Sequence, residues 1–324
     1  MLKSGISIRE AREAVKPGML ARAILIVSLA MTAIAAHAAD PHVLILREDG
    51  PIARQTADFL LADLARQGGV GRSARQFDIA EQESASAAMR GLRAGDDAIV
   101  VAIGPRALRP ASLVAAGRPI VATLVSLAAL EDFGPGVERI RAIVLDQPVP
   151  RLLNLVQAAL PAARRLGVLA GPSSMMPLRA LVRHAQDRGL TVSADVMTAS
   201  TEVVAALERL VPRMDLLLAL PDPLVHNRNT VQPLLLTTYR AGIPVVTYSE
   251  SYLQAGAAVA LFSTPKQIAL QTAEAIQQHP EKGMPPTIQT PRYFTVGVNT
   301  AVARSLGLSL PPVSELQERL SSLE

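Results

Sequence analysis

The chain has 324 residues, 49% of them apolar and 3% aromatic, with 32 basic residues, 28 acidic residues and no cysteine. This length suits two domains of moderate size, with cores built from aliphatic side chains. The absence of cysteine excludes disulfides, thiol nucleophiles, thiolate metal sites and a lipid-modified N-terminal cysteine.

Net charge excludes another class of partner. Five basic and two acidic residues fall within the first 38 positions, so the remainder carries 27 basic and 26 acidic residues. A chain so close to neutral gives no electrostatic case for nucleic acid or an anionic membrane as a partner.

The N-terminal segment has the pattern of an export signal. Residues 23–36 form an uncharged apolar run, preceded by Arg22 and followed by Ala36-His37-Ala38, a small-x-small cleavage pattern. About 14 residues is short for a membrane span but suits the core of a signal peptide. We therefore expect a signal peptide over residues 1–38, with Met19 as an alternative start. An uncleaved anchor or a buried helix is the alternative.

The next stretch alternates short apolar runs with helical patterns, which favours a parallel sheet covered by helices. Helices are expected over residues 57–67 and 84–92, and after Pro105, which suits a first helical turn. The apolar runs predict strands at residues 42–47, 75–80, 98–103, 120–125 and 140–145.

The alternation restarts after Asp146-Gln147-Pro148, which indicates a second lobe. Four helices are expected over residues 149–160, 201–214, 231–241 and 265–279, and another has its apolar face over residues 178–185 and ends at Gly189. A last helix is expected over residues 300–306, and residues 280–291 read as an extended connection. Strands are expected at residues 166–170, 190–196, 216–220, 243–248, 256–262 and 293–298.

Polar and turn-forming residues follow several of these strands, where open α/β sheets bind their ligands. Ser173 and Ser174 open a helix, whose free N–H groups attract carboxylates or phosphates. Asp222 is expected to receive a ligand ammonium group. The other candidates in the first lobe are Gly104, Arg106 and Ser126.

Each candidate also has a purely structural interpretation. Ser173 and Ser174 can simply cap their helix, Asp222 between two prolines suits a turn, and Arg106 suits a solvated first turn. Asn227 and Asn229 are expected to cap a helix, and the scattered histidines predict no metal site. No dinucleotide, phosphate-loop or nucleophile-elbow motif is complete, so neither a cofactor nor catalysis is expected.

Three stretches resemble the ABC-transporter substrate-binding proteins of the tryptophan/tyrosine-type branch. They are VLDQPVPRLLNLVQAALPAARRLGVLAGPSS at 144–174, LLLALPDPLVHNRNTVQPLLLTTYRAGIPVVTYSESYLQAGAAVALF at 216–262, and YFTVGVNTAVARSLGLSLP at 293–311. The resemblance implies the type I periplasmic-binding architecture, an α/β fold of two Rossmann-like lobes with parallel sheets joined by a hinge. The expected lobes are residues 39–146 plus about 247–279, and residues 147–246 plus about 280–324.

The resemblance also implies a function. The chain is expected in the periplasm, where it would capture a small metabolite, such as an amino-acid-like compound, between its lobes and pass it to an inner-membrane ABC permease. Ser249 and Glu250 join Ser173, Ser174 and Asp222 as positions that match ligand-facing segments of the family. The alternatives are a ligand-sensing or accessory module for a membrane sensor or outer-membrane transporter, and a two-lobed α/β enzyme.

Overall fold

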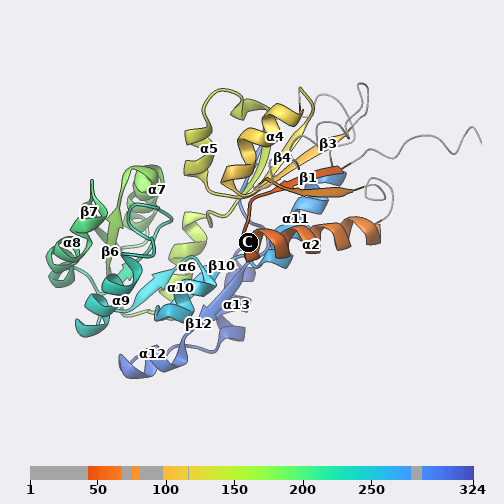
Figure 1. Ribbon diagram of the computed structural model, residues 1–324. Helices are drawn as coiled ribbons and strands as arrows, with labels where there is room; N and C mark the ends of the chain where they lie inside the picture. Colours follow the sequence, from red (N-terminus) through yellow and green to blue (C-terminus); the bar gives the residue numbers. More distant parts are fainter. Residues whose placement is uncertain (1–42, 68–73, 80–97, 116, 279–286) are drawn as a thin grey trace, which may run out of the picture. The chain divides into compact units, whose positions relative to one another are not determined.

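The computed structural model describes residues 43–67, 74–79, 98–115, 117–278 and 287–324. The expected signal peptide and the expected helix over residues 84–92 therefore lie outside the described residues. Two six-stranded sheets form within the described part, each covered by helices on both faces (Figure 1).

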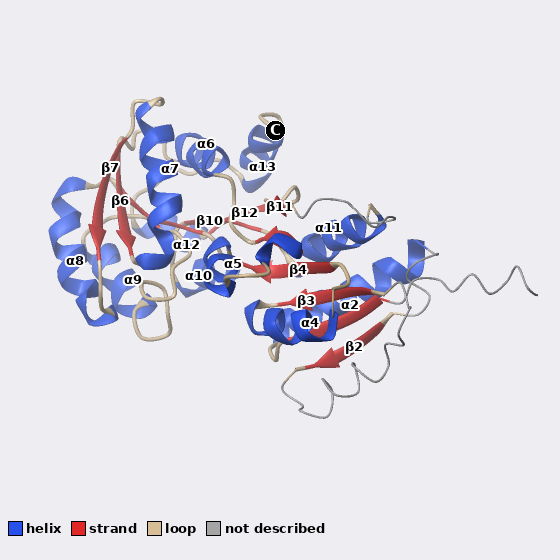
Figure 2. Ribbon diagram, turned by 90° about the horizontal axis from the view of Figure 1, so that it is seen from above, coloured by secondary structure: helices blue, strands red, loops and turns tan. Residues whose placement is uncertain are grey.

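The first sheet is parallel throughout, in the order β11-β5-β4-β3-β1-β2. Figure 2 shows β2, β3 and β4 pointing the same way, and β1 lies between β2 and β3 in the sheet. Its strands are β1 (Val43–Arg47), β2 (Arg75–Asp78), β3 (Ile99–Ile103), β4 (Ile120–Val125), β5 (Ile140–Val144) and β11 (Ile288–Gln289). Its helices are α2 (Pro51–Gln67), α4 (Leu108–Ala115), α5 (Leu127–Phe133) and α11 (Pro265–Gln277).

Alternate residues of each strand serve opposite cores, because successive side chains in a strand point to opposite faces. Leu44 and Leu46 pack with α4 and α5, whereas Val43 and Ile45 pack with α2 and α11. Helix α11 lies beside α2 although the two are far apart in the sequence (Figure 1). The continuous apolar runs seen in the sequence are thus strands buried on both faces.

The second sheet has the order β12-β10-β9-β8-β6-β7 and is parallel except for its edge strand β12, which runs antiparallel to β10. Its strands are β6 (Arg165–Ala170), β7 (Thr191–Val196), β8 (Leu216–Leu218), β9 (Val245–Thr247), β10 (Val259–Phe262) and β12 (Thr295–Val298). Its helices are α6 (Val149–Ala159), α7 (Met175–Gln186), α8 (Val203–Leu210), α9 (Val231–Arg240), α10 (Glu250–Ala255), α12 (Thr300–Ser305) and α13 (Val313–Ser321). Helices α6, α7 and α13 cover one face, and α8, α9 and α10 cover the other.

Sheet pairing corrects the expected lobe boundaries. Residues 247–262 were assigned to the first lobe, but β10 pairs with β9 and β12 and so belongs to the second sheet. Conversely, β11 pairs with β5 of the first sheet, although its residues were assigned to the second lobe. Local periodicity identifies a strand but not its partner, since pairing depends on contacts distant in sequence.

The chain passes between the sheets three times, at residues 145–148, 263–264 and 290–294. Hydrogen bonds link these crossovers. The Gln147 side-chain amide donates to Ser263 Oγ (3.1 Å), and the Ser263 hydroxyl donates to the Tyr293 carbonyl (2.7 Å). The α/β fold and the reset of the chain near residue 148 follow the sequence prediction.

Candidate functional site

Asp222 lies in the loop after β8, and its carboxylate connects this loop to the turn after β6 through hydrogen bonds. Its Oδ2 accepts hydrogen bonds from the Gly171 N–H (3.0 Å), the Ser174 N–H (3.0 Å) and the Ser174 hydroxyl (2.8 Å). Its Oδ1 accepts from the Leu224 N–H (2.9 Å), and the residue is only 2% exposed. The structure thus brings two predicted site residues together, with the carboxylate already hydrogen-bonded within the protein. Its expected contact with a ligand amine stays a prediction.

The β6–α7 turn has little room around this carboxylate. A Cβ on Gly171 would lie 2.8 Å from both Asp222 carboxylate oxygens, so only glycine fits without a shift. Ser174 is fully buried, whereas Ser173 is half-buried beside it. Of the two predicted serines, Ser173 is therefore the one with a surface open to a ligand.

In the first lobe, Gly104 and Arg106 meet a carboxylate that the sequence did not single out. Glu48 follows β1, and its Oε2 accepts from the Arg106 N–H (3.2 Å) and lies 3.7 Å from Arg106 Nε. Gly104 has φ 92°, and a Cβ there would lie 2.3 Å from Glu48 Cδ. The positive φ favours glycine here, and a side chain would also displace Glu48. The Arg106 side chain is 76% exposed, so its guanidinium remains open to solvent.

Ser126 lies where β4 passes into α5. Its Oγ accepts from the Ala129 N–H (3.2 Å), and Asp146 Oδ2 accepts from the Leu127 N–H (2.8 Å). Burial raises the pKa of Asp146 above its ordinary value, against the lowering effect of the hydrogen bonds from the backbone N–H groups of Leu127 and of Asp146 itself. Just before, Leu124 has φ 57° at a register shift between β4 and β5, a conformation that L-residues rarely adopt. Such strain is most often found at functional sites.

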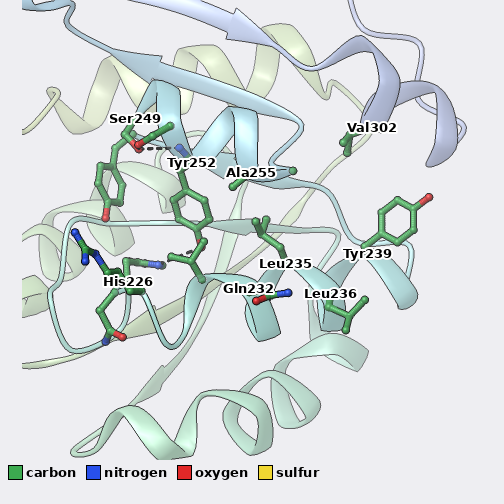
Figure 3. A pocket seen from close by; sticks show the side chains of 15 residues that line it. His226, Gln232, Leu235, Leu236, Tyr239, Ser249, Tyr252, Ala255 and Val302 are labelled. Atoms are coloured by element: carbon green, nitrogen blue, oxygen red, sulfur yellow. Dashed lines mark hydrogen bonds between the residues drawn. The ribbon is translucent and has the colours of Figure 1, made fainter. Parts of the chain in front are cut away.

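A groove of about 900 Å³ opens in the second lobe between α9 and α10 (Figure 3). Its lining comes from the loop before α9, from one face of α9, from the end of β9, from α10 and from Val302 of α12. Leu235, Leu236 and Tyr239 form its α9 side, and Tyr252 and Ala255 form its α10 side (Figure 3).

His226, Tyr248 and Tyr252 form an aromatic cluster at one end of the groove. Their ring centroids are 5.5–6.2 Å apart in tilted or edge-to-face pairs. Tyr252 Oη lies 3.3 Å from His226 Nδ1, while His226 Nε2 is buried with no hydrogen-bond partner among the described residues. Burial lowers the pKa of His226 to about 4 and raises that of Tyr248 to about 12, where the Asp222 and Asp146 charges add to the shift.

The remaining predicted residues, Ser249 and Glu250, lie at the start of α10. Ser249 Oγ accepts from the Tyr252 N–H (3.2 Å), so this serine caps the helix, and it also lines the groove. Glu250 is exposed in the first turn of α10. Both residues therefore lie beside the aromatic cluster.

Sequence reasoning missed Glu48, Asp146, Tyr248 and Tyr252. Asn227 was expected to cap a helix, and its Oδ1 accepts from the Asn229 N–H (3.0 Å). The one available signal for the cluster was compositional: the chain has only four tyrosines, and two of them, at positions 248 and 252, lie at the end of a predicted strand and just after it.

Comparisons with known proteins agree with this architecture. A family model described as ABC transporter substrate binding protein matches residues 74–312. Among curated proteins, none matches this sequence. In the described part of the chain, no helix has both the length and the apolar character needed to cross a membrane.

Solved structures share the fold. A Streptococcus pneumoniae ABC domain in complex with L-Trp has 13% identity and a TM-score of 0.60, over 87% of this chain and 98% of that one. An open, ligand-free substrate-binding protein with adhesive properties from Clostridium difficile has 20% identity and a TM-score of 0.66, over 84% and 96%. A conserved domain protein from Vibrio cholerae has 22% identity and a TM-score of 0.59, over 86% and 98%. At these identities the similarity confirms the type I periplasmic-binding fold.

Proposed function

The chain belongs to the ABC transporter substrate-binding protein family, and from this we propose that it is the periplasmic binding component of an importer. It captures a small metabolite between its lobes and passes it to an inner-membrane permease. The expected export signal, though outside the described residues, fits this location.

The observation that carries the proposal is the path of the chain through two separate sheets. Three short crossovers, joined through Gln147, Ser263 and the Tyr293 carbonyl, connect two cores that are otherwise complete. Short connections between independently packed lobes are what a hinge requires, because a few residues then absorb the change in backbone angles. Such a hinge lets the lobes close on a ligand.

We assign the ligand contacts to loops that follow the strands. Arg106 and Ser126 supply an exposed cation and a hydroxyl from the first lobe, and Ser173, Ser249 and Glu250 supply polar groups from the second. Gly104 and Ser174 do not contact the ligand but hold these loops in place, and Asp222 both holds the β6–α7 turn and is the predicted partner of a ligand amine. A cation on one lobe and a carboxylate on the other suit a zwitterion of the amino-acid type.

A thermal-shift screen tests this proposal. Residues 39–324 are purified, unfolded and refolded to remove bound ligand, then heated with amino acids, nucleobases, sugars, vitamins and small acids. A ligand that binds only the native state stabilises it by about 2.7 kcal/mol at one hundred times its Kd. One chemical class should raise the midpoint by several degrees. A flat screen from a cooperatively unfolding protein would contradict the proposal.

Transport is tested separately with the ligand identified by the screen. In the source cell, loss of the chain should abolish high-affinity uptake of that ligand, and the wild-type chain should restore it. An Arg106→Glu chain, with its charge reversed, should not restore uptake, whereas Arg209→Glu, on the exposed side of α8, should. Unchanged uptake without the chain would argue for sensing rather than import.

A further inference from the structure

The groove between α9 and α10 shares only Ser249 with the ligand contacts assigned to the import proposal, and all of its lining residues belong to the second lobe. We propose that this groove is a binding site for a small, neutral aromatic molecule that carries a hydrogen-bond acceptor. The inference does not depend on the import role, because it uses no residue of the first lobe. Its basis is the size, the aromatic content and the unpartnered polar atom of the groove.

The size and composition of the groove suit such a molecule. At about 900 Å³ it lies within the range of small-molecule pockets, which are lined mostly by apolar and aromatic side chains. Three of the four tyrosines in the whole chain, Tyr239, Tyr248 and Tyr252, line it. In a protein without tryptophan this places three of the nine tyrosine and phenylalanine rings in one groove, and ring–ring contacts favour aromatic ligands.

His226 supplies the polar contact. Tyr252 Oη and His226 Nδ1 share a hydrogen bond in which either atom could be the donor. Burial raises the pKa of Tyr252, so its hydroxyl stays protonated, and we assign this hydroxyl as the donor. The low pKa of His226 keeps its ring neutral, which leaves the ring proton on Nε2. Nε2 is buried without a hydrogen-bond partner among the described residues. A buried donor without a partner is costly, and a ligand carbonyl or ether oxygen would satisfy it.

The surroundings favour a neutral ligand over a charged one. Asp222, whose charge acts on His226 and Tyr248, already accepts four hydrogen bonds from the protein and does not line the groove. Arg228, at the same end, is exposed and remains solvated. A charged group placed against the apolar walls would lose its hydration without a buried partner.

Fluorine NMR tests the site directly, with 3-fluorotyrosine in place of the four tyrosines and Tyr→Phe variants to assign the signals. Acetophenone is the probe, and isopropylbenzene is its counterpart of similar shape without an acceptor. The signals of Tyr239, Tyr248 and Tyr252 should shift with one common Kd, while Tyr293, outside the groove, stays fixed. Isopropylbenzene should bind roughly 3- to 10-fold more weakly, the range of one hydrogen bond.

Two pairs of comparisons decide the outcome. Gln232→Trp should fill the groove and abolish the shifts, whereas Gln186→Trp, at an exposed glutamine on α7, should leave them unchanged. His226→Phe should remove the preference for acetophenone over isopropylbenzene. The proposal is overturned if no signal moves, if Tyr293 moves with the others, or if Gln232→Trp has no effect. Tighter binding of benzylammonium or benzoate than of acetophenone would overturn the neutral class.

Discussion

Asp222 shows how one carboxylate can hold two loops of the second lobe. Four donors from the β6–α7 turn and the following loop converge on it, and almost none of it is exposed. An amide in its place would turn one of the two oxygens into a donor facing other donors. The residue thus stabilises the fold even in the absence of ligand.

We therefore expect Asp222→Asn to lower the free energy of unfolding of the ligand-free protein by about 1–3 kcal/mol. Urea unfolding followed by circular dichroism measures this. Asp195→Asn is the matched control, because Asp195 pairs with the half-exposed Arg209 and such pairs contribute about 0–1 kcal/mol. Equal losses of unfolding free energy in the two variants would show that the Asp222 hydrogen bonds contribute no more stability than an exposed ion pair.

His226 should make stability depend on pH. Its pKa is about 4 in the folded protein against an ordinary 6.5, so between these values the unfolded chain binds a proton that the native protein does not. Stability is therefore lost as the pH falls from about 6.5 to 4, by up to about 3 kcal/mol from this residue.

The measurement is the difference in unfolding free energy between pH 7 and pH 4.5, for the wild type and for His226→Gln. Other titrating groups contribute to both proteins, so the difference between them isolates His226. The loss on acidification should be smaller in His226→Gln. Identical pH profiles would mean that His226 is not buried in its neutral form.

At the scale of elements, Arg151 joins α6 to the end of the chain. Its guanidinium is 3% exposed, donates to Gln147 Oε1 (2.8 Å), to the Pro291 carbonyl (2.7 Å) and to both carboxylate oxygens of Glu324 (2.7 and 2.5 Å). Its guanidinium carbon lies 4.4 Å from the centroid of the Phe294 ring. One side chain thereby fixes α6, a crossover and the residues that follow α13.

Replacement of this arginine should be costly, because it leaves two buried acceptors, Gln147 Oε1 and the Pro291 carbonyl, without this donor and removes the ion-pair partner of Glu324. We expect Arg151→Met to lower the unfolding free energy by about 3–5 kcal/mol. Arg319→Met, which removes an exposed i,i+4 pair with Glu315 on α13, should cost less than about 1 kcal/mol. A small effect of Arg151→Met in chemical denaturation would contradict this account.

At the scale of the molecule, the proposed hinge predicts a change in the distance between the lobes. The chain has no cysteine, so Leu113→Cys on α4 and Met176→Cys on α7, both at exposed positions, introduce two unique labelling sites. Spin labels there should give a distance distribution that shifts and narrows when the ligand from the screen is added. Binding that leaves the distribution unchanged would exclude closure by hinge motion.

The strands were predictable from the sequence wherever both of their faces are buried. β4 has the predicted bounds, and β3 and β5 each differ by one residue, because an apolar run between turn residues leaves little choice. The short helices α5 and α10 were missed, and so was α13, whose Leu316 and Leu320 lie at helical spacing. These helices bury few side chains, so their periodic signal is weak.

The candidate site was less predictable, because its contacts join residues far apart in the sequence. The proximity of Ser174 to Asp222 depends on the pairing of β6 with β8, and that of His226 to Tyr252 depends on the packing of α9 against α10. The turn residues themselves indicated where the loops would be. Which side chains of those loops contact one another could be seen only in the structure.

The order in which the chain visits the two sheets bears on its synthesis. Residues 43–144 make most of the first lobe, but α11, which covers α2, and the edge strand β11 come only after the whole stretch from α6 to β10. During translation or export, the apolar side of α2 that packs against α11 therefore stays exposed until more than one hundred intervening residues have been synthesised or exported. The second lobe lies between these two parts of the first lobe in the sequence. All of its strands except β12 come in one continuous stretch, so it can begin to fold before the first lobe is complete. An unfinished first lobe of this kind is a natural client for a holding chaperone.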